Sequence, residues 1–277
     1  MTWIILSTNG DSFNTLGGGT FRLIKIEWVS EDRLTPYIDR TWGCPDRARE
    51  LYELDRRLSA LLFEAISYIE VALRNSINAY LTETYGDDWY TQVEVGFDNR
   101  VRANITESWE SLPKRFTSVN ADRNRKLGGR VVAASMFRTW TNMLDKGDVS
   151  ALPAPFDRAD HDRIWDAMAL NRVFPGARQL ARQQDPDFEH HGLTRQWVYT
   201  KVFPVRQIRN RIAHHESLTP KGVPITGTNT RLTPRECHHA CLELGAMIDR
   251  DLRSFLENLA VTNALNELDS FTGSLQT

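Results

Sequence analysis

Residues 46 to 85 read DRARELYELDRRLSALLFEAISYIEVALRNSINAYLTETY, with no proline or glycine to interrupt them. Apolar side chains recur here at intervals of three and four, which is the spacing of one helix face. They are Leu51, Leu54, Leu58, Leu61, Leu62, Ala65, Ile69, Ala72, Leu73, Ile77 and Leu81. Pro45 suits a first helical turn and Gly86 a helix end, so the pattern predicts one long central helix or two helices that meet near Asp55. We favour the single helix.

Helical periodicity continues outside this stretch, and alternation typical of strands is scarce. The further predicted helices are 99–111, 129–145, 159–174, 194–215 and 233–259. Pro204 is expected to kink or split the fourth of them. A short hairpin is possible in the loop of residues 216–232, which is rich in glycine and proline. The predicted fold class is all-α.

The ends of the chain look different from its middle. Residues 1–25 contain Asn9-Gly10 and the triplet Gly17 to Gly19, which predicts a poorly packed extension or a start assigned too early. Residues 26–260 are expected to form one helical domain. The polar residues 261–277 are predicted to be a frayed tail.

The overall charge excludes a uniformly basic nucleic-acid coat protein, because the formal net charge of the 277 residues is -2. The three cysteines Cys44, Cys237 and Cys241 form no disulfide framework, which favours a reducing compartment. We expect no signal peptide and no membrane span, since no apolar run approaches the required length. The expected location is the cytoplasm.

The segment VRQIRNRIAHHE, residues 205–216, gathers three arginines and two histidines at the end of a predicted helix. Helical spacing produces two polar stripes, one of Arg206, Asn210 and His214 and one of Arg211 and His215. Arg209 lies about 140° around the helix from His214. A long side chain, a distorted helix end or a second subunit would be needed to bring them together.

Two interpretations of this segment remain open on composition. Cations at a helix C-terminus interact favourably with the helix dipole and need no function. Alternatively, arginine offers a charged planar group for phosphate, and histidine transfers protons near neutral pH. The second interpretation predicts RNA cleavage without a metal.

The stretch from Arg209 to Glu216, RNRIAHHE, resembles the R-N-x-x-A-H-H signature of Abi-like proteins, a branch of the HEPN superfamily. Glu70 to Asn75, EVALRN, resembles the E-V-x-L-R-N motif on the long helix of that family. Asp32 to Tyr37 with Leu51 and Tyr52, and the segment from Phe137 to Leu144, are similar to further family segments in the same order. The likeness spans roughly residues 26 to 220.

The resemblance implies a HEPN-like helical bundle, with a C-terminal helix, and a metal-independent endoribonuclease activity. It also implies a homodimer, in which two motifs line one cleft across a two-fold axis. Arg209 and His214 would be catalytic, with His215 the alternative acid-base residue. RNA 2′-OH attack would leave a 2′,3′-cyclic phosphate and a 5′-OH, and no cofactor is expected.

Other residues receive supporting predictions. Asn210 would orient the cleft or cap neighbouring backbone. Glu70, Arg74 and Asn75 would support the cleft from the long helix. A buried ion pair between Glu70 and an arginine is the plainer explanation for Glu70. Arg206 and Arg211 would bind RNA. Locally basic residues could guide RNA or simply be solvated; they are Arg100, Arg102, Lys114, Arg115, Arg123, Arg125, Lys126 and Arg130.

We predict no metal site. Cys237-His238-His239-Ala240-Cys241 lacks a second ligand pair and lies in a helical pattern, so two core thiols are the better interpretation. His190-His191, beside Asp185 and Asp187, is expected at the surface.

Three functions compete. The first is an abortive-infection or toxin-type ribonuclease that cleaves tRNA or mRNA. The second is a non-catalytic module that binds a regulatory non-coding RNA or a protein antitoxin. The third is a nucleotide-binding HEPN relative.

Overall fold

The computed structural model describes residues 13–16, 19–22, 24–118 and 127–275. The helices of its first half are α1 (Glu31–Arg40), α2 (Pro45–Tyr85), α3 (Asn99–Glu110), α4 (Lys114–Thr117), α5 (Leu127–Ala134) and α6 (Phe137–Met143). Those of its second half are α7 (Ala167–Val173), α8 (Ala177–Gln184), α9 (Phe188–His191), α10 (Arg195–Ala213), α11 (Pro234–Ile248), α12 (Arg250–Glu257) and α13 (Val261–Gly273). The all-α prediction is confirmed.

Short elements complete the described part of the chain. Strands β1 (Phe13–Leu16) and β2 (Gly19–Arg22) form an antiparallel hairpin, and β3 (Val223–Pro224) pairs with β4 (Arg231–Leu232). Three 3₁₀ helices are η1 (Ile26–Trp28), η2 (Trp89–Thr91) and η3 (His161–Arg163). The predicted hairpin in the loop 216–232 is confirmed, whereas β1 and β2 lie within the predicted N-terminal extension. Most of that extension, residues 1–12, 17–18 and 23, lies outside the described residues.

Helix α2 is one uninterrupted helix of 41 residues, as favoured from its sequence. Pro45 occupies its first turn, and Gly86, with φ +96°, ends it in a conformation that side chains disfavour. Its apolar stripe is buried along its whole length and includes Leu58, Leu62, Ile69, Leu73 and Leu81. Burial of this stripe stabilises the fold, because apolar burial is the dominant favourable contribution to folding free energy.

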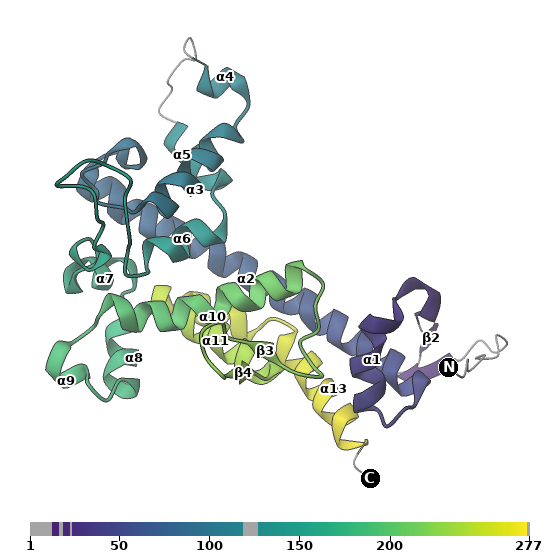
Figure 1. Ribbon diagram of the computed structural model, residues 1–277. Helices are drawn as coiled ribbons and strands as arrows, with labels where there is room; N and C mark the ends of the chain where they lie inside the picture. Colours follow the sequence, from purple (N-terminus) through teal and green to yellow (C-terminus); the bar gives the residue numbers. More distant parts are fainter. Residues whose placement is uncertain (1–12, 17–18, 23, 119–126, 276–277) are drawn as a thin grey trace.

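The other helices surround α2, which runs across the molecule in Figure 1 with α10 lying along it. Helices α1 and α13 pack on its N-terminal half, and α6 and α7 pack on its C-terminal half. Helix α11 contacts both α2 and α10. Buried apolar residues from each of these elements belong to one continuous hydrophobic core.

Three predicted helices are shorter in the structure than in the sequence pattern. The stretch 129–145 is divided at Ser135 and Met136, and 233–259 is divided at Asp249. The stretch 159–174 yields only η3 and α7. Aspartates cause two of these breaks, because Asp166 and Asp249 accept backbone N–H groups of the following helix and cap it.

Two further predictions need correction. Pro204 does not split α10, which continues through it. The predicted frayed tail is wrong, because α13 begins at Val261 and packs against α2 with Leu265, Leu268 and Phe271 buried. Its apolar residues recur at threes and fours, a period masked by the polar residues between them. No helix among the described residues is both long and apolar enough to cross a bilayer.

Candidate active site at the end of helix α10

Helix α10 ends at Ala213, and the residues that follow form a hydrogen-bonded cap with its last turn. The N–H of His215 donates to the carbonyl of Ile212 at 2.9 Å, and the N–H of Glu216 donates to that of Arg211 at 3.0 Å. These two bonds define a Schellman motif, in which the residue after the cap adopts a left-handed conformation. That residue is His215, with φ +56°, where glycine is usual.

His214 itself is the C-cap of α10, and its side chain is exposed. Its backbone N–H donates to the carbonyl of Asn210 at 3.0 Å, so its main chain is fixed while its ring faces solvent. Asn210 is half-buried. An exposed imidazole on a fixed backbone can exchange protons with a bound substrate.

Arg209 turns toward the long helix. Its Nε lies 3.9 Å from Oε2 of Glu70, and the two side chains are 31% and 20% exposed. Burial raises the pKa of Glu70, and the charges of Arg209 and Arg74 offset this only in part. The structure therefore brings together three residues that the motifs singled out, namely Arg209, Glu70 and Arg74.

Other predicted residues lie apart from this group. Asn75 is exposed on α2, one position and therefore about 100° around the helix from Arg74. Arg206 donates from Nη1 to Thr141 and Asn142 of α6, at 2.9 Å each. Burial lowers the pKa of Arg206. This arginine thus joins α10 to α6 and is not available at that nitrogen for RNA.

Arg211 is also engaged, because it donates from Nε to the carbonyl of Ser217 and from Nη1 to Glu216 at 2.7 Å. Its side chain folds over the turn that follows its own helix. Both residues predicted to bind RNA, Arg206 and Arg211, therefore have structural partners within the described chain.

The turn after His214 is held by residues that sequence reasoning missed. Asp55 of α2 is fully buried and accepts the backbone N–H groups of Leu218 and Thr219 at 3.0 and 2.8 Å. Arg33 of α1 donates to the carbonyl of His215 at 2.7 Å. The sequence did contain a signal for the role of Asp55, because charged residues are rarely buried without partners and this carboxylate lies among the apolar positions of the long helix.

Within the basic region of residues 100–130, Arg100 is neutralised by two carboxylates. Arg100 pairs with Asp98 and with Asp145, whose carboxylate lies 2.8 Å from it. Burial would raise the pKa of Asp145, but His161, the N–H of Gly147 and Arg100 together hold it below its ordinary value. Arg123, Arg125 and Lys126 lie outside the described residues.

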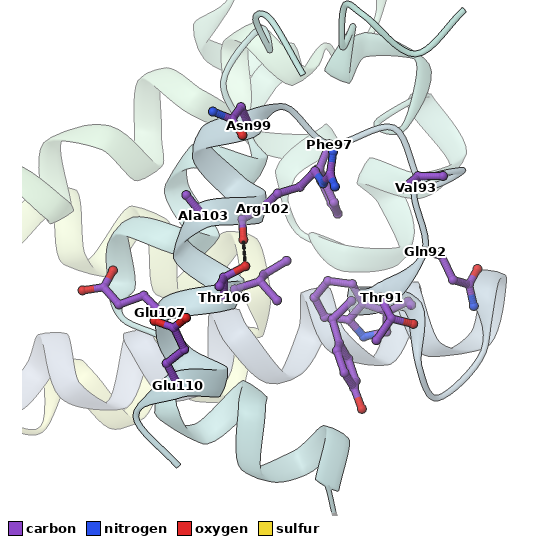
Figure 2. Close-up of a pocket in the computed structure, with 13 residues that line it drawn as sticks. Thr91, Gln92, Val93, Phe97, Asn99, Arg102, Ala103, Thr106, Glu107 and Glu110 are labelled. Carbon is purple, nitrogen blue, oxygen red and sulfur yellow. Dashed lines mark hydrogen bonds between the residues drawn. The ribbon is translucent and has the colours of Figure 1, made fainter. Parts of the chain in front are cut away.

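A pocket of about 570 Å³ lies elsewhere, between η2 and α3. Figure 2 shows Glu107 and Glu110 on α3 and Thr91 and Gln92 on the segment across from them. Neither Arg209 nor His214 lines it. Two carboxylates and one arginine, Arg102, line this pocket, so it lacks the excess of positive charge that suits a polyanion such as RNA.

The cysteine pair and the surface histidines carry no catalytic arrangement. Cys237 and Cys241 are buried thiols, as predicted, and burial raises the pKa of Cys237 to about 12. Among the described residues, Asp185, Asp187 and His191 place possible ligand atoms within 4.8 Å of one another. They are partly to fully exposed, and such acidic groups are common without a metal, so we assign no site to them.

One known protein family matches the part of the chain that contains these residues. A family model described as Abi-like protein matches residues 45–219, from the start of α2 to the turn that Asp55 holds. The chain belongs to the Abi-like protein family. The matched segment contains Arg209, His214, Glu70 and Arg74, but not α1 or the helices after the turn. No curated protein and no solved structure matches the chain.

Proposed function

We propose that this Abi-like protein is a metal-independent endoribonuclease that acts as an abortive-infection or toxin-type effector. The observation that carries the proposal is the end of α10, where an exposed His214 stands on a fixed backbone five residues after Arg209. The membership of the chain in the Abi-like family supports the biological context. The HEPN assignment rests on the resemblance of the motif.

In the proposed reaction, the 2′-OH of an RNA ribose attacks the neighbouring phosphorus. One histidine accepts the hydroxyl proton as the new P–O bond forms, and a protonated acid donates a proton to the departing 5′-oxygen as its bond to phosphorus breaks. Arg209 stabilises the additional charge on the phosphorane oxygens. The products are a 2′,3′-cyclic phosphate and a 5′-OH, so no water is consumed.

A second subunit completes this proposal. Helix α10 is regular through Ala213, which keeps Arg209 and His214 on different sides of one helix. In a two-fold symmetric dimer, Arg209 of one protomer and His214 of its partner share a cleft. The substrate class is tRNA or mRNA, and a protein antitoxin or a non-coding RNA would restrain the activity before infection.

The decisive experiment is incubation of purified protein with total RNA in EDTA. We expect cleavage by the wild-type protein, fragments that end in cyclic phosphates, and no cleavage of DNA, which lacks the attacking hydroxyl. His214→Ala should abolish cleavage without lowering the melting temperature. The matched control is His239→Ala, an exposed histidine of α11 that should remain active.

Two results would contradict the proposal. Cleavage that requires an added divalent metal would exclude the metal-independent route. Tight RNA binding without cleavage in any RNA class would instead favour the non-catalytic module.

A further inference from the structure

The turn that follows His214 is fixed at nearly every peptide group, although surface turns are ordinarily mobile. The carbonyl of His215 accepts from Arg33 at 2.7 Å, and that of Glu216 accepts from Arg56 at 2.8 Å. The carbonyl of Ser217 accepts from Arg211. Three consecutive carbonyls are thus each bound by a different guanidinium.

Two backbone N–H groups of the same turn are bound by one carboxylate. Oδ1 of Asp55 accepts the N–H groups of Leu218 and Thr219, and its Oδ2 accepts from the Tyr37 hydroxyl at 2.8 Å and from Arg56. The Leu218 side chain is fully buried beneath the turn. Asp55 and Leu218 therefore fasten the turn to the body of the molecule.

The pKa shifts of Arg56 and Tyr37 keep both side chains as hydrogen-bond donors to Asp55. Burial alone would lower the pKa of Arg56, but the adjoining Asp55 carboxylate more than offsets it and raises that pKa. Burial and the same carboxylate raise the pKa of Tyr37, so its hydroxyl remains a donor at physiological pH. We call Arg33, Asp55 and Arg56 the turn clamp.

The clamp holds a backbone that would otherwise relax. His215 has φ +56°, a conformation that is unfavourable for a residue with a Cβ and persists where its surroundings enforce it. The enforcing contacts come from α1 and α2, which are distant in sequence from the motif. They act on the residues directly beside His214.

We infer that Arg33, Asp55 and Arg56 are positioning residues, which hold the turn of residues 215–219 so that the His214 imidazole is presented to RNA in one orientation. This inference rests on the proposed ribonuclease function and deepens it. The three residues do not touch the substrate. They set the direction in which the chain leaves α10, and thereby restrict the geometry of the acid-base group.

Arg33→Ala is the cleanest test, because the side chain is exposed and, among the described residues, it donates one hydrogen bond, to the His215 carbonyl. We expect kcat for RNA cleavage to fall on the order of 10- to 100-fold, the loss typical of a displaced catalytic group, while KM and the melting temperature stay unchanged. Arg33→Lys should restore much of kcat, since an ammonium group can donate to the same carbonyl.

The matched control is Arg57→Ala, which removes a neighbouring arginine of α2 that pairs with Glu267 instead of the turn. It should keep the wild-type kcat. If Arg33 contacted RNA directly, its loss would raise KM and reduce the salt dependence of binding, and the positioning role would be rejected.

A second measurement follows the turn without using activity. In Asp55→Asn, amide hydrogen exchange at Leu218 and Thr219 should accelerate, and the NMR signals of the His214 ring should broaden. Wild-type exchange in this variant, or a wild-type kcat in Arg33→Ala, overturns the inference. If the wild-type protein itself cleaves no RNA, the proposed function fails and the catalytic role of the clamp fails with it, whereas accelerated exchange would still show that Asp55 holds the turn.

Discussion

His215 occupies the position in the closing turn of α10 where most helices place glycine. A histidine there has the steric cost of its Cβ, while its backbone groups take part in the same two closing hydrogen bonds that glycine would make. The side chain is exposed, so packing does not explain its presence. The two adjacent histidines can therefore be separated by what each substitution does to stability and to activity.

We predict that His215→Gly raises the free energy of unfolding by up to about 1 kcal/mol, because glycine relieves the left-handed conformation. If His214 is the acid-base residue, the variant should also retain most of its RNA cleavage. Urea unfolding and cleavage assays check both parts. A stable but inactive variant would transfer the acid-base role to His215.

Glu70 supplies a second prediction, based on the sign of its pKa shift. Burial raises the folded-state pKa above the ordinary value of 4.5, so the contribution of this carboxyl to stability is present below that pH and declines as the pH rises through the raised value. The uncharged side chain introduced by Glu70→Gln avoids the cost of burying a charge. We therefore expect its stability relative to wild type to be more favourable at pH 7 than at pH 4.

Thermal unfolding of both proteins at the two pH values measures this difference. The Gln variant should also cleave RNA more slowly, because Arg209 loses the carboxylate beside its Nε. A variant that is relatively less stable at pH 7 would mean that the attraction of the two arginines outweighs burial.

In the candidate site, neighbouring residues were predictable where a local motif carried them, whereas the catalytic roles of Arg209 and His214 stay predictions. Arg209, His214, Glu70 and Arg74 stand in short segments whose spacing could be read directly, and the structure places Glu70 and Arg74 beside Arg209. The turn clamp was not predictable, because Arg33 lies 182 positions from the carbonyl that it binds. No periodicity in a sequence encodes such a contact.

At the scale of elements, helix length was the main failure of sequence reasoning. Apolar periodicity runs across residues 159–174 and 233–259, yet the chain leaves the helical conformation near Asp160 and Asp166 in the first and at Asp249 in the second. An aspartate side chain that binds its own backbone competes with helix continuation. By contrast, α2 has no such break, and its single-helix prediction was correct.

Contacts between elements also limit which residues are tolerated, as at Gly176 before α8. A Cβ at this position would lie 2.0 Å from the carbonyl oxygen of Ala246 in α11. The backbone N–H of Gly176 donates to Met247 at 3.0 Å, which holds the two segments close. Glycine is required here because a side chain would not fit between the two segments, and not because of the backbone conformation.

We predict that Gly176→Ala lowers the free energy of unfolding by about 1–3 kcal/mol, since the backbone of α11 must shift. Gly129→Ala is the matched control, because a Cβ there meets nothing within 4 Å and the residue lies inside α5. The control should gain about 0.5–1 kcal/mol from its higher helix propensity. Equal stabilities of the two variants in urea would contradict the close packing of α8 on α11.

At the scale of the whole molecule, the all-α class and the central position of α2 followed from composition and periodicity alone. The packing of α13 against α2 did not, because the polar residues of 261–277 obscured its apolar face. The family segment of residues 45–219 likewise leaves out α1 and α13, which cover the N-terminal half of α2. Helices outside the matched segment therefore also contribute to the packing around the central helix.

The proposed dimer leads to a prediction about mixed assemblies. Arg209→Ala and His214→Ala should each be inactive alone. When the two are unfolded and refolded together, mixed dimers would contain one intact pair in trans, and roughly a quarter of the wild-type activity should return if subunits associate at random. Light scattering should show two chains per particle, and complete inactivity of the mixture would place both residues of the pair on one chain.

Helix α2 holds Arg209 through Glu70 and holds the histidine turn through Asp55, and these two attachment points are 15 residues apart on a helix without a break. At 1.5 Å per residue, their spacing along the axis is about 22 Å. Because the helix is uninterrupted between these two residues, it keeps their separation constant. Folding of each protomer therefore sets where Arg209 and the histidine turn lie along α2, and dimerisation is left only to bring the two protomers' contributions together.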